Sequence, residues 1–190
     1  MTNFKIVVFL GVDGSGKSTL INSIIKKNKL KFKKIHFTPD YFRNKKVQTE
    51  NPHLKKKRGK LFSLLKLIYW IINYKLFEII NYKSHKVFFF DRYLSDIIID
   101  PLRYRFSLSA KITNQVIKFI LKPDLIILLR GSPKEIYSRK QELKLKEIIK
   151  INNKYIKFIK KHDNKLILDC SDKIYSNRNK VLSYIKRLTI

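Results

Sequence analysis

Short apolar runs alternate along the chain with longer stretches in which apolar residues recur every three or four positions. The runs predict strands at Phe4–Leu10, Lys34–Phe37, Val87–Phe90, Leu125–Leu129 and Leu166–Leu168. The periodic stretches predict helices at Lys17–Asn28, Gly59–Tyr82, Ala110–Leu121, Pro133–Leu145, Glu147–Lys161 and Ile174–Leu188. Ser132 before Pro133 fits an N-cap followed by a first-turn proline. Strands that alternate with helices predict a doubly wound α/β fold with a parallel sheet.

The length and composition of the chain fit one domain. With 190 residues, 44% of them hydrophobic, the chain can bury a sizeable core. It shows no internal repeat, long linker or low-complexity tail, so we expect a single domain over residues 1–190. The lone cysteine, Cys170, excludes an intramolecular disulfide and suits a reducing cytosol, and an inert, partly buried thiol is its simplest interpretation. No signal peptide is visible, and we expect a cytoplasmic protein.

The strong positive charge bears on the choice of partners. A formal net charge of +29 favours affinity for nucleic acid or for an anionic membrane surface. Lysine supplies most of this charge and is scattered among Ile, Asn, Phe and Tyr, without an aromatic-interleaved nucleic-acid motif. We therefore interpret the charge as a compositionally biased, solvated surface, with a nucleic-acid footprint as the alternative. The densest cluster is Lys55-Lys56-Lys57-Arg58 with Lys60.

The segment Leu61–Tyr82 is close to the length that spans a bilayer and follows this basic cluster. Lys66, Lys75 and Glu78 interrupt it, and charges in the middle of a span are costly. We therefore expect a buried core helix. Peripheral membrane contact through residues 55–82 and a true membrane span are the alternatives.

The most specific motif is GVDGSGKST at residues 11–19, which matches G-x-x-x-x-G-K-[ST] between a predicted strand and a predicted helix. Its glycines let the backbone N–H groups face phosphate oxygens, and the following helix N-terminus adds positive potential. Lys17 should bridge the β- and γ-phosphates of ATP, and Ser18 should ligate Mg²⁺. The residues expected around the ATP phosphates are Gly11, Asp13, Gly14, Ser15, Gly16, Lys17, Ser18 and Thr19.

A carboxylate and an arginine follow the strand predicted at Val87–Phe90. Ligands of open α/β sheets bind at the carboxyl ends of the strands, so Asp91 is the expected second residue on the Mg²⁺ side, directly or through water. Arg92 can grip a phosphate with two hydrogen bonds. A turn in which these two residues pair with each other is the alternative.

Four segments together resemble the thymidylate kinases in order and spacing: Gly11–Thr19, Asp91-Arg92-Tyr93, Pro123-Asp124-Leu125 and Leu166–Asp169. The resemblance covers most of the chain. It implies a P-loop nucleoside-monophosphate-kinase-like three-layer fold with a five-stranded parallel sheet, ATP with Mg²⁺ as donor, and transfer to a nucleoside monophosphate, dTMP to dTDP. It also implies that Asp13 contacts the acceptor sugar and that Arg92 holds the acceptor phosphate. Dimers are usual in this family, so a homodimer is a further expectation.

The remaining groups follow from position. In the resembled family a mobile segment after the fourth strand supplies basic residues, and Ser138–Leu143 occupies that place. We expect Arg139, ahead of Lys140, to be the cation that stabilises the transferring phosphoryl group, with a plain surface arginine as the alternative. The residues expected around the acceptor are Asp13, Arg43, Arg92, Tyr93, Asp96, Arg103 and Arg105. For Asp96, Arg103 and Arg105 the alternative is a set of salt bridges on a helix surface.

Some positions depart from the family's pattern. The turn Thr38–Arg43 shares only its proline, with Arg43 as a substitute cation, and the helix that should carry an arginine facing the thymine ring has none. Arg130 stands where an acid is usual. With these departures the chain resembles a divergent branch of the family, whose members are associated with surface-polysaccharide biosynthesis. Three hypotheses follow: a thymidylate kinase, a kinase for another acceptor such as a polysaccharide precursor, and a nucleotide-dependent protein that contacts nucleic acid or membrane.

Overall fold

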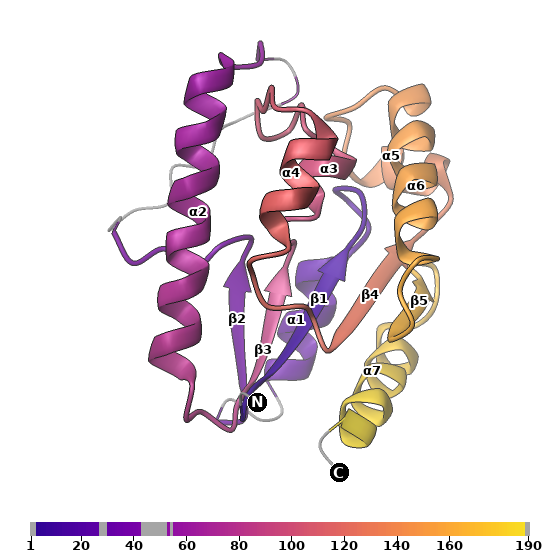
Figure 1. Ribbon diagram of the computed structural model, residues 1–190. Coiled ribbons are helices and arrows are strands. Elements are labelled where there is room, and N and C mark those ends of the chain that lie inside the picture. The colour runs from indigo at the N-terminus through magenta and orange to yellow at the C-terminus, as the bar shows by residue number, and fades with distance from the viewer. Residues whose placement is uncertain (1–2, 27–29, 43–52, 54, 189–190) are drawn as a thin grey trace.

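Strands and helices alternate in the order that the hydrophobic pattern predicts (Figure 1). A computed structural model describes residues 3–26, 30–42, 53 and 55–188. In this part of the chain the strands are β1 (Lys5–Leu10), β2 (Phe32–His36), β3 (Val87–Asp91), β4 (Leu125–Arg130) and β5 (Lys165–Asp169). The helices are α1 (Lys17–Ile25), α2 (Lys60–Asn81), α3 (Asp96–Ile99), α4 (Ala110–Ile117), α5 (Pro133–Arg139), α6 (Leu145–Ile159) and α7 (Ile174–Leu188).

The described strands form one parallel sheet in the order β2-β3-β1-β4-β5, which confirms the predicted five-stranded parallel sheet. β1 lies at the centre, with Ile6 beside Phe88 of β3 and Val7 beside Leu125 of β4. After β1, the chain first forms β3 and β2 on one side of it and then β4 and β5 on the other side, so the strand order reverses at β1. Ligands of open α/β sheets bind at the carboxyl ends of the strands at such a reversal.

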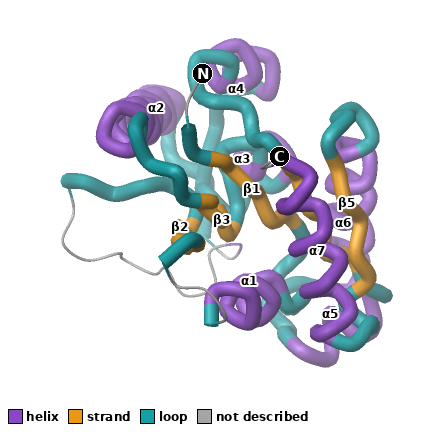
Figure 2. The backbone as a smooth tube through the Cα atoms, turned by 90° about the horizontal axis from the view of Figure 1, so that it is seen from below, coloured by secondary structure: helices purple, strands orange, loops and turns teal. Residues whose placement is uncertain are grey.

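Helices cover both faces of the sheet and so produce the predicted three layers (Figure 2). Helices α1 and α7 pack on one face, together with Val7 and Phe9 of β1. Helices α2, α3 and α6 pack on the other face, together with Ile6, Val8 and Leu10. Because both faces are covered, β1, β3 and β4 are continuous apolar runs rather than alternating ones.

Several helix ends differ from the predicted ones. The helix predicted at Pro133–Leu145 ends at Arg139, because the backbone of Lys140 is extended, with φ −156° and ψ 111°. Its start is as predicted, since the Ser132 side chain accepts a hydrogen bond from the Glu135 N–H at 3.3 Å. The short helix α3 was not predicted, because four residues are too few to show a helical period.

Helix α2 contributes one face to the core. Leu67, Trp70, Tyr74 and Phe77 are buried, and the ring centroids of Phe77 and Phe88 are 4.8 Å apart. The prediction of a core helix is confirmed for this inner face, whereas the outer face exposes apolar side chains to solvent. None of the helices in the described residues is long and apolar enough to cross a membrane.

Candidate active site

The loop between β1 and α1 wraps closely around its own backbone at the centre of the sheet. Gly11 has φ 139°, and a Cβ atom there would lie 2.4 Å from the carbonyl oxygen of Leu129 on β4. Gly16 has φ 86° and stands directly before the first residue of α1, Lys17. Both positions need glycine, because L side chains rarely adopt these backbone angles. The sequence therefore builds a tight loop that opens into a helix N-terminus, as a phosphate site requires.

Lys17 is buried inside this loop. Its ammonium group donates hydrogen bonds to the carbonyl oxygens of Gly11 at 2.8 Å and Val12 at 2.9 Å, and lies 3.4 Å from Ser15 Oγ. Burial and then the nearby charge of Arg92 lower the pKa of Lys17 to about 7. An anion that entered the loop would oppose both effects, so this lysine is placed to respond to a phosphate with a change of protonation.

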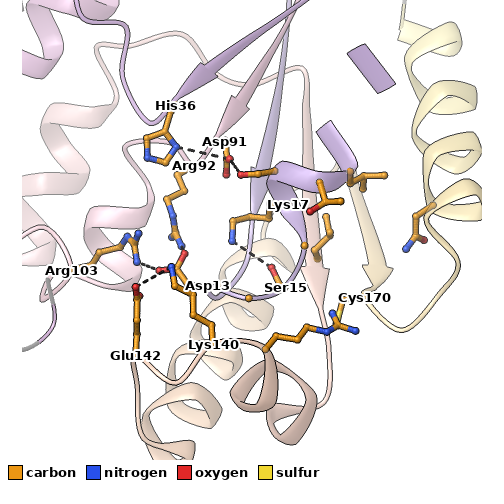
Figure 3. A pocket seen from close by; sticks show the side chains of 18 of the residues that line it. Asp13, Ser15, Lys17, His36, Asp91, Arg92, Arg103, Lys140, Glu142 and Cys170 are labelled. Carbon is orange, nitrogen blue, oxygen red and sulfur yellow. Dashed lines mark hydrogen bonds and ion pairs between the residues drawn. The ribbon is translucent and has the colours of Figure 1, made fainter. Parts of the chain in front are cut away.

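Ser18 and Asp91 lie side by side, as the predicted metal pair requires. The Ser18 hydroxyl donates a hydrogen bond to Asp91 Oδ2. Two basic side chains of β2 approach the same carboxylate. The Lys34 ammonium group lies 3.3 Å from Asp91 Oδ2, and His36 Nδ1 lies 3.9 Å from it (Figure 3). Burial alone would raise the pKa of Asp91, but His36, Lys17, Ser18 and Lys34 together hold it well below its usual range. Asp91 is therefore a carboxylate at neutral pH.

These two residues fit Mg²⁺. Mg²⁺ prefers oxygen ligands, keeps several waters and commonly takes only one or two protein groups plus substrate phosphates. The Ser18 hydroxyl and the Asp91 carboxylate supply two such oxygens beside the loop of residues 11–16, which is called the phosphate loop after its sequence motif. Among the described residues there is no cluster of three or more His, Cys, Asp or Glu side chains that could hold a metal ion without substrate.

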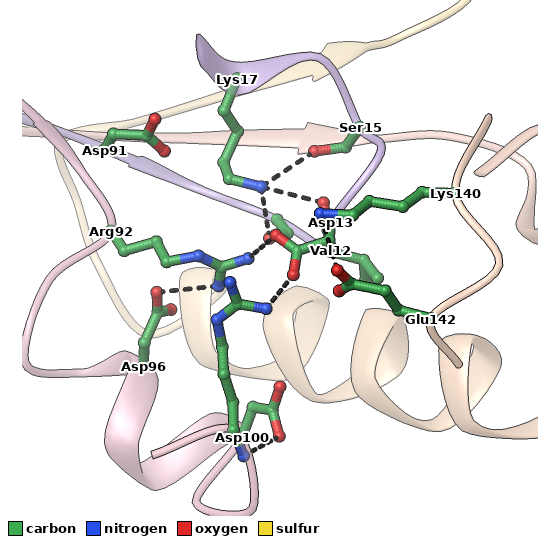
Figure 4. Close-up of polar contacts among 12 residues, drawn as sticks. Val12, Asp13, Ser15, Lys17, Asp91, Arg92, Asp96, Asp100, Lys140 and Glu142 are labelled. Atoms are coloured by element: carbon green, nitrogen blue, oxygen red, sulfur yellow. Dashed lines mark hydrogen bonds and ion pairs between the residues drawn. The ribbon is translucent and has the colours of Figure 1, made fainter. Parts of the chain in front are cut away.

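On the other side of the loop, Asp13 lies between two arginines. Its carboxylate forms ion pairs with Arg92 and Arg103, one oxygen to each guanidinium group (Figures 3 and 4). Arg92 is almost fully buried and has a left-handed backbone with φ 80°. Such a conformation is costly for a residue with a side chain and persists where the surrounding structure fixes it. The cluster thus holds two guanidinium groups next to the phosphate loop.

Two buried groups fix the Arg92 guanidinium from behind. Arg92 NH1 donates to Asp96 Oδ2 at 3.2 Å (Figure 4). It also donates to the Tyr155 hydroxyl at 3.1 Å. Burial raises the pKa of Asp96 despite the neighbouring Arg92. Asp96 is fully buried and is not part of the cavity lining, so it supports Arg92 rather than contacting a ligand.

The segment after α5 brings further cations to the site. The Lys140 ammonium group pairs with Glu142 at 2.9 Å, and both residues lie close to Asp13 (Figures 3 and 4). The Arg139 side chain also lines the cavity, where it forms a hydrogen bond with the Cys170 thiol. Burial raises the pKa of this thiol, which agrees with the expected inert cysteine.

One cavity of about 930 Å³ is lined by Lys17, by the Ser18–Asp91 pair and by Asp13 with its two arginines. Its volume is at the upper end for small-molecule sites and suits two ligands bound together. The predicted site residues in its lining are Asp13, Gly14, Ser15, Gly16, Lys17, Ser18, Thr19, Asp91, Arg92, Arg103 and Arg139. Gly11 supports the loop from below, through its close approach to β4.

Other predicted acceptor residues lie elsewhere. Tyr93 is buried in the core and its hydroxyl donates to the carbonyl oxygen of Leu121 at 2.8 Å, because the residue after Arg92 points back under the sheet. Arg105 points away from the cavity and donates to the carbonyl oxygen of Lys56 at 3.0 Å. These two positions, like Asp96, are therefore not contact residues of the cavity. Arg43 lies outside the described residues.

Among the residues of the site that were not predicted are His36, Lys66 and Tyr155. His36 is the last residue of β2, so the rule that places ligands at strand ends could have identified it. Lys66 lines the cavity from α2. In the sequence it is only a charge within an apolar segment, and nothing there indicates a ligand contact. Tyr155 lies in the middle of α6, and no local signal marks it. Tertiary packing alone brings it to Arg92.

Comparison with known proteins supports the fold. No protein-family model and no curated protein matches the sequence. Among solved structures, the thymidylate kinase from Candida albicans is similar with a TM-score of 0.65 and 18% identity, over 98% of this chain and 93% of that chain. The deoxyadenosine kinase from M. mycoides with bound dATP is similar with a TM-score of 0.59 and 18% identity, over 95% of this chain and 99% of that chain. The chain therefore has the P-loop nucleoside kinase fold, as predicted.

Proposed function

We propose that this protein is a phosphotransferase that moves the γ-phosphate of ATP to a small phosphorylated acceptor, with dTMP as the expected acceptor and dTDP as its product. The observation that carries this proposal is the single cavity in which the phosphate loop, the Ser18–Asp91 pair and the arginines around Asp13 meet. The two similar solved structures named above are kinases that act on nucleosides or nucleotides by name, which supports the same choice.

On the donor side, the loop and Lys17 would bind the ATP phosphates. Lys17 now bonds to loop carbonyl oxygens, and it would exchange these bonds for phosphate oxygens. Bound Mg²⁺ would neutralise charge on the donor phosphates, and Ser18 and Asp91 are the residues that would hold it.

On the acceptor side, Arg92 and Arg103 would bind the acceptor phosphate. Asp13 occupies both guanidinium groups, so an incoming phosphate would compete with its carboxylate. Because Asp96 and Tyr155 hold Arg92 in place, little reorganisation is needed when the acceptor binds. The phosphate oxygen of such an acceptor is itself the nucleophile, so no general base is required. Arg139 and Lys140 would stabilise charge on the transferred group.

The lining of the cavity favours a second candidate acceptor. Lys66 and Tyr104 belong to this lining, and α2 offers no arginine that could contact a thymine ring. A site whose base-binding donor differs from the usual one discriminates differently among acceptors. The second candidate is therefore a phosphorylated sugar, such as a precursor of a surface polysaccharide.

The decisive experiment measures ADP release from ATP and Mg²⁺ with a panel of nucleoside monophosphates and sugar phosphates. Lys17→Ala provides the blank. Arg92→Lys keeps the positive charge but cannot donate two parallel hydrogen bonds to one phosphate, and it should reduce turnover at least about a hundredfold. The matched control, Arg187→Lys on the exposed side of α7, should retain full turnover. If no acceptor on the panel produces more ADP than the Lys17→Ala blank, the proposed function is wrong.

A further inference from the structure

The end of β2 brings a histidine to the Ser18–Asp91 pair. Strands β2 and β3 pair in parallel, and their register places His36 opposite Asp91. His36 Nδ1 lies 3.9 Å from Asp91 Oδ2, and Figure 3 shows the imidazole ring beside this carboxylate. The Ser18 hydroxyl donates a hydrogen bond to the same oxygen, and all three residues line the cavity. An imidazole, a carboxylate and a hydroxyl therefore meet at one point.

The spacing of these groups suits the ligands of one metal ion. With bonds of about 2.1 Å, two ligands of one ion lie about 3.0 Å apart at a right angle and about 4.2 Å apart on opposite sides. The separation of 3.9 Å between His36 Nδ1 and Asp91 Oδ2 falls within this range. It is long for a hydrogen bond. An ion could thus contact both groups without a rearrangement of the two strands.

A lysine of the same strand neutralises this carboxylate. The Lys34 ammonium group lies 3.3 Å from Asp91 Oδ2. The Asp91 side chain is only 3% exposed, and a buried carboxylate needs a counter-charge. The Lys34 side chain is partly exposed, so it can move into solvent when another cation binds. Lys34 and a metal ion would therefore be alternative counter-charges for the same oxygen.

An ion pair is the competing explanation for the position of His36. Lys34 already supplies a counter-charge to Asp91. A second cation adds little here, because the His36 side chain is 52% exposed and solvent screens its charge. A metal ion, in contrast, would use the nitrogen lone pair of a neutral imidazole, which an ion pair does not use.

We propose that His36 is the third protein ligand of the metal ion held by Ser18 and Asp91, and that this site takes a transition-metal ion such as Mn²⁺ in preference to Mg²⁺. Mg²⁺ takes oxygen ligands, whereas imidazole nitrogen also binds first-row transition metals. Lys34 competes with the ion for Asp91. The inference rests on the metal pair of the proposed function and does not depend on the identity of the acceptor.

Electron paramagnetic resonance of the full chain with Mn²⁺ alone tests the ligand directly, without nucleotide or turnover. Pulsed measurements should show modulation of the Mn²⁺ signal by the coordinated imidazole nitrogen. His36→Gln should remove this modulation. The matched control, His85→Gln, changes an exposed histidine just before β3 and should keep it.

The same signal measures affinity, because free and bound Mn²⁺ differ in their spectra. His36→Gln should weaken Mn²⁺ binding at least about tenfold, since the loss of groups around a metal commonly costs this much. The affinity for Mg²⁺, measured by competition with Mn²⁺, should stay within about twofold, because Mg²⁺ gains little from a nitrogen ligand.

A lysine variant should act in the opposite direction. Lys34→Gln removes the competing cation and should tighten Mn²⁺ binding about threefold to tenfold. Lys33→Gln is the matched control, because it removes the same charge from the next residue, whose exposed side chain points to the other face of β2. It should stay within about twofold, since exposed charges are screened.

Several results would overturn the proposal. They are a chain that binds no Mn²⁺, a bound Mn²⁺ signal without nitrogen modulation, and equal Mn²⁺ affinities of the parent chain and His36→Gln. A Lys34→Gln variant that binds Mn²⁺ no more tightly than Lys33→Gln would also overturn it. The failure of the proposed function is a separate result, because it is judged by ADP release and not by Mn²⁺ spectra.

Discussion

In the proposed function, the low pKa of Lys17 would make ATP binding depend on pH, by an amount that follows from this pKa. Burial and Arg92 lower this pKa to about 7. At pH 7 about half of the lysines are then neutral, and at pH 9 only about one in a hundred carries its proton. A phosphate in the loop favours the charged form, so ATP binding above pH 7 must be accompanied by uptake of a proton.

The expected size follows from the charged fraction. The affinity for ATP should fall about fiftyfold from pH 7 to pH 9, and at pH 8 each bound ATP should bring uptake of about 0.9 proton. Titration calorimetry at pH 8 in two buffers of different ionisation enthalpy measures this uptake directly. The phosphates of ATP are already ionised at this pH, so the proton is assigned to the protein.

The control is Lys17→Arg, because a guanidinium group stays charged over this whole range. In this variant proton uptake should disappear, and any remaining affinity should be flat from pH 7 to pH 9. An unchanged affinity of the parent protein over the same range, or an uptake close to zero at pH 8, would refute the reasoning.

Three further predictions concern the loop, the acceptor side and the metal pair. Gly11→Ala would place a methyl group against Leu129 at an unfavourable φ and should lower the free energy of unfolding in urea by roughly 2–5 kcal/mol, whereas Gly59→Ala, which meets no atom within 4 Å, should cost about 1 kcal/mol at most. Arg103→Gln should raise the KM for the acceptor at least about tenfold and leave the Kd for ATP within about twofold, because Arg103 pairs with Asp13; equal effects on both constants would contradict this. Asp91→Asn should lower the thermal stability more at pH 7 than at pH 3, because the pKa of Asp91 is held below its usual range: its carboxylate stabilises the fold fully above the pKa of the unfolded chain and loses part of this contribution at pH 3, on the way to the lower pKa of the folded chain. Equal losses at the two pH values would count against it.

The sequence predicts the architecture well because the strands are covered on both faces. Val87–Phe90 and Leu125–Leu129 are short continuous apolar runs, which are typical of strands in a sheet covered on both faces. The phosphate loop is equally predictable from the sequence, because local backbone geometry fixes the spacing of its residues. Helix ends are less readable: α5 stops at Arg139 although the apolar period continues.

The acceptor side is only partly predictable, because it depends on contacts between distant residues. Asp13 and Arg103 meet across the cavity, and Tyr155 reaches Arg92 from another helix. Neither contact has a local signature. Tyr93 shows the opposite error, since a tyrosine next to a functional arginine was expected in the site and lies in the core. A residue's neighbours in sequence do not reveal which way its side chain points.

The central place of β1 also sets the order in which the protein can fold. β1 is made before the other described strands but pairs with β3 and β4, and the Ile6 N–H donates to the carboxylate of Asp124, 118 residues later. The phosphate loop gains its support at Leu129 only after β4 has been made. Parallel pairing between segments far apart in the sequence forms slowly. Because β3 and β4 are synthesised later, β1 stays unpaired during much of synthesis. Its apolar run is thus the segment most exposed to aggregation before the chain is complete.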